Sequence, residues 1–173
     1  DIYVKENTLL SVVHIPVILT ESGLTDVVYN DFHVGKNANV IILAGCGVHN
    51  DAHKDTEHDG IHRFYLEENA KVKYIEKHYG EGSGKGKKIL NPVTEIYMKS
   101  GSSMTMDTTQ IKGVDTTERK TIGVLESNTT LVINEKILTE GHQKAKTIFQ
   151  VDLNGDNAST HVTSRSVATE NSY

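Results

Sequence analysis

The sequence NANV at residues 37–40 places a small polar turn directly before a strand-forming segment, and similar sequences recur along the chain. They are NAKV at 69–72, GSSM at 101–104, NTTL at 128–131 and NAST at 157–160. The fourth residues of these segments are separated by 32, 32, 27 and 29 positions. Self-similarity with a period near thirty is typical of a solenoid, a propeller or stacked hairpins.

The segments between these turns favour β-structure. Most of the second half alternates polar and apolar residues with period two, and no segment keeps a period of 3.6 over three helical turns. Only Asn154-Gly155 matches the turn dipeptide that is common in hairpins. The sequence therefore predicts an all-β fold with a β-solenoid first, and a β-sandwich or a cupin-like barrel as alternatives.

Local patterns indicate where strands and loops lie. Residues 9–20 read as a buried strand with Pro16 at a bend or an edge, and residues 40–44 as a fully buried strand. In Lys71 to Lys77, Val72 and Tyr74 are expected inside, with Glu76 among the outward residues. Gly80 to Lys88 reads as a flexible Gly/Lys loop, because its spacing fails the phosphate-binding P-loop pattern.

Composition narrows the class of protein. The 173 residues suit a single domain, and a formal charge of −5 gives no indication of a nucleic-acid surface. There is no apolar run long enough to span a bilayer and no signal peptide at the start. A single cysteine excludes an intrachain disulfide and favours a reducing cytoplasm. The absence of an initial Met suggests a piece of a longer protein.

Potential chemistry concentrates in AGCGVHNDAHKDTEHDGIH, residues 44–62. This segment holds the only cysteine, Cys46, together with His49, His53, His58 and His62. Thiolate and imidazole are ligands for borderline and soft metal ions, so the four histidines are candidate ligands. The glycines of the segment predict a loop, and a surface loop held by hydrogen bonds is the alternative interpretation.

Cys46 itself allows two interpretations. It directly follows the buried strand and lies between Gly45 and Gly47, which leave room for another molecule to approach. A thiol near imidazoles can become a nucleophile or a ligand. A free cysteine is also commonly a small buried apolar residue, and the sequence pattern does not separate these roles.

Four stretches resemble the core of SufB/SufD proteins, most closely a short archaeal and clostridial SufB-like form. They are Ile42–His62, Lys71–Pro92, Gln110–Thr121 and His161–Ala168, with the strings AGCGVHND and EKHYGEG as the most specific parts. The resemblance implies a right-handed parallel β-helix in a cytoplasmic scaffold for iron–sulfur cluster assembly. It also implies two partners, a SufC-type ABC ATPase and a SufB/SufD paralogue or second copy.

The resemblance places Cys46 where SufB proteins carry a cysteine thought to take up or pass on sulfur, and it gives no role to the four histidines. The resemblance also implies that later coils, which hold the nascent cluster, a helical tail that binds SufC and the family's N-terminal region are missing from residues 1–173. Residues 1–173 are thus expected to be a core fragment that is not an enzyme, keeps no stable cluster and self-associates through an open strand edge. The alternative function is a small cupin-like metalloenzyme or metal-binding protein that uses His49–His62.

Overall fold

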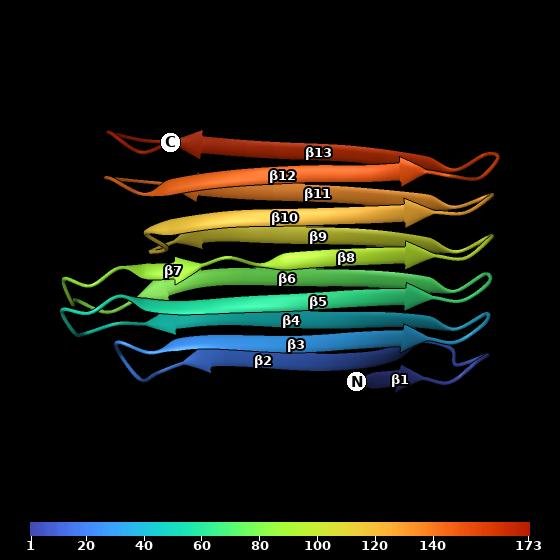
Figure 1. The fold of residues 1–173 in the computed structure, drawn as a ribbon, viewed down its shortest axis with the longest axis horizontal. Coiled ribbons are helices and arrows are strands. Elements are labelled where there is room, and N and C mark those ends of the chain that lie inside the picture. The colour runs from blue at the N-terminus through green and yellow to red at the C-terminus, as the bar shows by residue number, and fades with distance from the viewer.

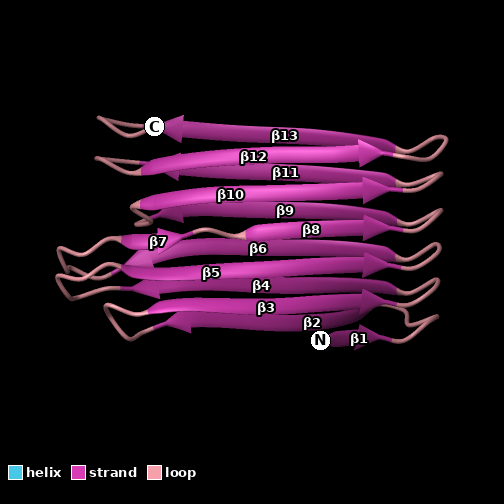
Figure 2. Cartoon of the chain, viewed as in Figure 1, coloured by secondary structure: helices cyan, strands magenta, loops and turns pink.

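The computed structural model describes all residues from Asp1 to Tyr173, and its regular elements are all strands (Figures 1 and 2). The structure contains no helix that is long and apolar enough to cross a lipid bilayer. The strands are β1 (Ile2–Val4), β2 (Ser11–Leu19), β3 (Thr25–Val34), β4 (Asn39–His49), β5 (Thr56–Leu66), β6 (Lys71–Glu81), β7 (Lys88–Leu90), β8 (Val93–Met98), β9 (Ser103–Lys112), β10 (Thr116–Leu125), β11 (Thr130–Thr139), β12 (Lys144–Leu153) and β13 (Ser159–Ala168).

Successive strands alternate between two sheets, so that each pair of strands makes one flattened coil stacked on the next (Figure 1). One sheet has the order β1-β3-β5-β7-β10-β12, with β8 also between β5 and β10, and the other has the order β13-β11-β9-β6-β4-β2. Neighbouring strands are parallel throughout. This architecture confirms the predicted β-solenoid and excludes a cupin-like barrel, whose strands are antiparallel.

The repeat found in the sequence sets the register of the stack. Val40 pairs with Val72, which pairs with Met104. Met104 pairs in turn with Leu131, and Leu131 with Thr160. These are the fourth residues of the five repeated turns, so the unequal spacings of 32, 32, 27 and 29 all correspond to one complete coil.

The repeated turns form a column at one corner of the coils. Their first residues have a positive φ angle, close to +57° at Asn37, Asn69, Asn128 and Asn157 and +76° at Gly101. Asn and Gly are the residues that enter this left-handed region most readily. The Asn37 amide donates to the Asn7 Oδ1 at 3.0 Å, and that of Asn157 to the Asn128 Oδ1 at 3.1 Å, so the column also links successive coils.

The interior is divided into an apolar and a polar part. Near the asparagine corner, 18 buried residues form one apolar core, in which Phe32 and Phe64 stack at 4.7 Å between ring centroids. Farther along the same strands, inward positions carry polar residues instead, including His62 on β5 and Glu76 on β6. A flattened coil therefore buries most of its hydrophobic surface near the asparagine corner and a set of polar and charged groups farther along the strands.

Several sequence-based assignments were wrong. Residues 44–62 are mostly strand: β4 continues to His49, β5 begins at Thr56, and only residues 50–55 form a turn. The glycines permit close packing within strands, since a Cβ on Gly47 would lie 2.5 Å from the Tyr79 ring. In the next segment β6 continues to Glu81, which shortens the predicted Gly/Lys loop. Pro16 lies in β2, which is an edge strand as predicted, but β2 is not the buried strand expected for residues 9–20, because its residues are half-buried or exposed.

Candidate functional site

Cys46 points into the β-helix and is only 3% exposed. It lies on β4, where buried residues alternate, and its neighbour across the sheet is His78 on β6. On the side away from the main core it packs with Val48, Leu90 and Val114. Because β4 stays regular past the glycines, the alternation that buries Val40 and Ile42 also turns Cys46 inward.

Four buried side chains form what we term the interior polar cluster: Glu76, His78, Arg119 and Glu135, of which Glu76 and His78 lie next to Cys46. Arg119 extends from β10 in one sheet toward β6 and β11 in the other. Its Nη1 donates to the Glu76 Oε2 at 2.8 Å and its Nη2 to the His78 Nδ1 at 2.7 Å. Its Nε lies 3.3 Å from the Glu135 Oε2. One guanidinium thus connects two carboxylates and an imidazole across the interior.

The contact with Arg119 fixes the proton of His78. A guanidinium can only donate hydrogen bonds, so the His78 Nδ1 must accept and its proton must lie on Nε2. That Nε2 is 3.3 Å from the Glu76 Oε1 but is not aligned for a hydrogen bond. Burial lowers the pKa of His78, against the raising effect of Glu76, which agrees with a neutral imidazole.

Glu76 is the anionic centre of the cluster. The Tyr74 hydroxyl donates to its Oε1 at 2.7 Å, and Arg119 holds its other oxygen. Burial alone would raise the pKa of Glu76, but the charges and hydrogen bonds around it, including the Arg119 guanidinium, hold the pKa well below the ordinary value. The carboxylate therefore stays ionised although it is almost wholly buried.

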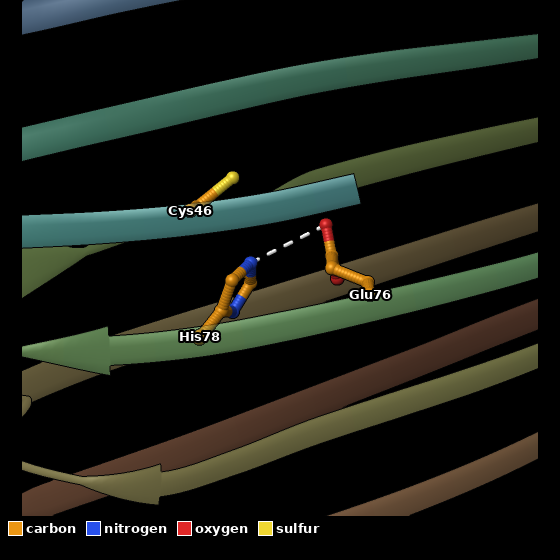
Figure 3. Close-up of side chains that lie close together, drawn as sticks. All are labelled: Cys46, Glu76 and His78. Carbon is orange, nitrogen blue, oxygen red and sulfur yellow. Dashed lines mark ion pairs between the residues drawn. The ribbon is translucent and has the colours of Figure 1, made fainter. Parts of the chain in front are cut away.

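Cys46, Glu76 and His78 approach one another closely (Figure 3). The Cys46 sulfur, a Glu76 oxygen and a His78 ring nitrogen all lie within 4.8 Å of one another, and all three side chains are buried. Burial, followed by the nearby Glu76 charge, raises the pKa of Cys46 to about 12. The resting thiol is therefore protonated near neutral pH.

The structure does not gather the four histidines singled out in the sequence. His49 is half-buried at the end of β4 and bonds Asp51 at 2.8 Å, and His53 is exposed in the turn of residues 50–55. His58 and His62 lie inside on β5. The His58 Nδ1 lies 2.8 Å from the Asp26 Oδ2, and the Nδ1 of His62 has no partner.

Glu76, His78 and Arg119 were missed as site residues, and Glu76 was wrongly expected to face outward. A signal was present, because positions 72, 74, 76 and 78 share one face of a strand that keeps period two. Continuing inward from Val72 and Tyr74 leads to Glu76 and His78. The prediction failed because a buried carboxylate is rare unless it is paired, and its partner Arg119 is 43 residues away.

The fold and this site define a β-solenoid protein whose single thiol faces a charged interior. The family model described as "SUF system FeS cluster assembly, SufBD core domain" matches residues 48–173, which is more than half of the chain. The chain therefore belongs to the SufB/SufD core-domain family of iron–sulfur cluster assembly proteins. The match begins two residues after Cys46. Searches of curated proteins and of solved structures gave no significant match.

Proposed function

We propose that this chain is a non-enzymatic scaffold segment for iron–sulfur cluster assembly and that Cys46 accepts the sulfur. The observation that supports this role is the position of the only thiol, inside a SufB/SufD-type β-helix and beside the interior polar cluster. Polar groups without partners continue along the same interior, among them Thr108, Gln110 and Thr121. They offer hydrogen bonds to a bound sulfur species that an apolar core would not.

The proposed step is a persulfide exchange with a cysteine desulfurase. The Cys46 thiolate attacks the outer sulfur of the donor's persulfide, the donor's S–S bond breaks, a new S–S bond forms on Cys46, and the donor cysteine leaves as a thiolate. The thiol proton passes to solvent or to the donor. Since burial raises the pKa of Cys46 to about 12, the step requires the donor to open the coil around Cys46.

Iron and the completed cluster are substrates of the assembly rather than resident groups of residues 1–173. In this proposal the chain acts in the cytoplasm with a SufC-type ATPase and with a SufB/SufD paralogue or second copy. The cupin-like metalloenzyme is not retained, because the strands are parallel.

The test is sulfur loading by a cysteine desulfurase and free cysteine, followed by mass spectrometry of the intact chain and of its peptides. We expect one added sulfur on the peptide that contains Cys46, and none in Cys46→Ser. A matched variant, His49→Gln, should load like the wild type, because His49 lies at the rim of the coil. Wild-type protein that remains unmodified under conditions that load a known acceptor would refute the role of Cys46.

A further inference from the structure

We propose that Cys46, Glu76 and His78 form a buried binding site for one divalent transition-metal ion, of the class of Zn²⁺ or Fe²⁺. These residues are distinct from the four histidines suggested by the sequence. The inference is also independent of sulfur transfer, because it concerns the resting chain in the absence of a sulfur donor.

The charge of the interior favours a bound cation. Glu76 and Glu135 are two buried carboxylates that share a single buried cation, Arg119. The Glu135 Oε1 accepts a hydrogen bond from Ser164 at 2.8 Å, and its Oε2 lies 3.3 Å from the Arg119 Nε. One formal negative charge thus remains without a counterion, and burying such a charge is costly.

His78 cannot supply the missing positive charge while Arg119 occupies its Nδ1, because a doubly protonated imidazole has no lone pair to accept that bond. A divalent ion that displaces the thiol proton of Cys46 would balance the charges. The thiolate and two carboxylates then carry three negative charges, and Arg119 with the ion carries three positive charges.

The type and arrangement of the donor atoms also favour such an ion. Sulfur, imidazole nitrogen and carboxylate oxygen together are characteristic of zinc and of divalent iron. The three donor atoms lie within 4.8 Å of one another. Small movements of the side chains would place all three at metal–ligand distances of about 2.0 to 2.3 Å from one ion between them. Tyr74 and Arg119 already hold the Glu76 carboxylate, which orients it as outer-shell hydrogen bonds do in metal sites.

The His78 Nε2 is the atom that points to a missing ligand. It is buried, has no hydrogen-bond partner and belongs to the group of three donor atoms. Binding an ion at Nε2 moves the remaining ring proton to Nδ1, so the Nη2 of Arg119 must release His78. Arg119 can keep its contacts with Glu76 and Glu135. Metal binding therefore predicts a local rearrangement of Arg119.

Titration with Co²⁺ tests the site, because a thiolate bound to Co²⁺ gives a charge-transfer band in the near ultraviolet. The ion is added to the reduced chain without oxygen and, in a parallel sample, during refolding from urea. We expect one Co²⁺ per chain, the thiolate band, and displacement of Co²⁺ by Zn²⁺. Cys46→Ser should remove the band, and His78→Gln, which keeps an acceptor for Arg119, should weaken binding by at least about tenfold.

His49→Gln is the matched control and should bind like the wild type, because His49 lies outside the group of three ligands. Circular dichroism confirms that each variant is folded before its titration is interpreted. A folded wild-type chain without the band, a band that persists in Cys46→Ser, or a band that disappears in His49→Gln would each overturn the proposal. A negative result in sulfur loading would not affect it, because no sulfur donor is present in the titration.

Discussion

Arg119 allows this narrow interior to hold two carboxylates. It is almost wholly buried and reaches Glu76, His78 and Glu135 from the opposite sheet. A buried ion pair contributes little net stability compared with apolar packing, but removal of one of its two partners leaves an uncompensated charge in the interior. As long as Glu76 and Glu135 are present, Arg119 is therefore expected to be essential for the stability of the fold.

Arg119→Met is expected to lower the free energy of unfolding by about 3 to 5 kcal/mol, because Glu76 and Glu135 lose their only buried cation. Urea denaturation followed by circular dichroism measures this change. The matched control is Lys146→Met, which removes an exposed pair with Glu118 and should change stability by less than about 1 kcal/mol. Equal effects of the two substitutions would contradict the central position of Arg119.

The buried imidazoles make stability depend on pH. Burial lowers the pKa of both His62 and His78 below the ordinary value of 6.5. The unfolded chain therefore takes up more protons as the pH falls below about 6.5, and the folded state loses stability by up to about 1.4 kcal/mol per pH unit and histidine. Glu76, whose folded pKa is depressed, adds a further loss only below its ordinary value of 4.5.

Urea denaturation between pH 7.5 and 5.5 should show this loss, and His62→Phe should reduce it by about half. Phenylalanine also suits the site, since His62 stacks near Phe32 and its Nδ1 has no partner. His142→Gln, which changes an exposed histidine, is the control and should leave the pH dependence unchanged. If His62→Phe leaves the pH dependence of the stability unchanged, groups other than His62 cause that dependence.

At the scale of the strand, the sequence contained enough information for the register but not for the site. Five turns with similar sequences aligned Val40, Val72 and Met104 because a stacked coil requires its corners to coincide. The same period-two pattern is interrupted by glycines between residues 44 and 62, which led to the wrong prediction of a loop. The interior polar cluster depends on contacts between residues that are far apart in the sequence, such as Glu76 and Arg119, and local patterns do not encode these contacts.

The asparagine corner provides a test of the turn chemistry. Asn69 has φ +58°, and an alanine there should destabilise the chain by about 1 to 2 kcal/mol, because a Cβ is strained in this region. Asn69→Gly should cost less, since the next corner naturally has Gly101 at φ +76°. Urea denaturation compares the two variants. If alanine and glycine are equally tolerated, backbone conformation does not explain the asparagines.

At the scale of the molecule, each coil contacts only the coils next to it, so stability is built from neighbouring interfaces. The central strands carry the apolar core and the interior polar cluster, with Tyr74 and Glu76 both on β6. By contrast, nearly every residue of β13 is exposed, and β13 pairs with β11 alone. Cys46 and its ligand candidates therefore lie in the part of the stack that opens least often.

Hydrogen exchange monitored by mass spectrometry should show this gradient directly. Amides of β6 pair with both β4 and β9 and should exchange only in near-global unfolding, whereas those of β13 should exchange at least about 100-fold faster. Peptides covering Lys71–Glu81 and Ser159–Ala168 have similar lengths and serve as a matched pair. Equal protection of the two strands would mean that the chain unfolds as one unit. Because β6, which pairs with the strand of Cys46, opens by itself only in near-global unfolding, binding of the sulfur donor has to drive the opening of the coil that persulfide exchange requires.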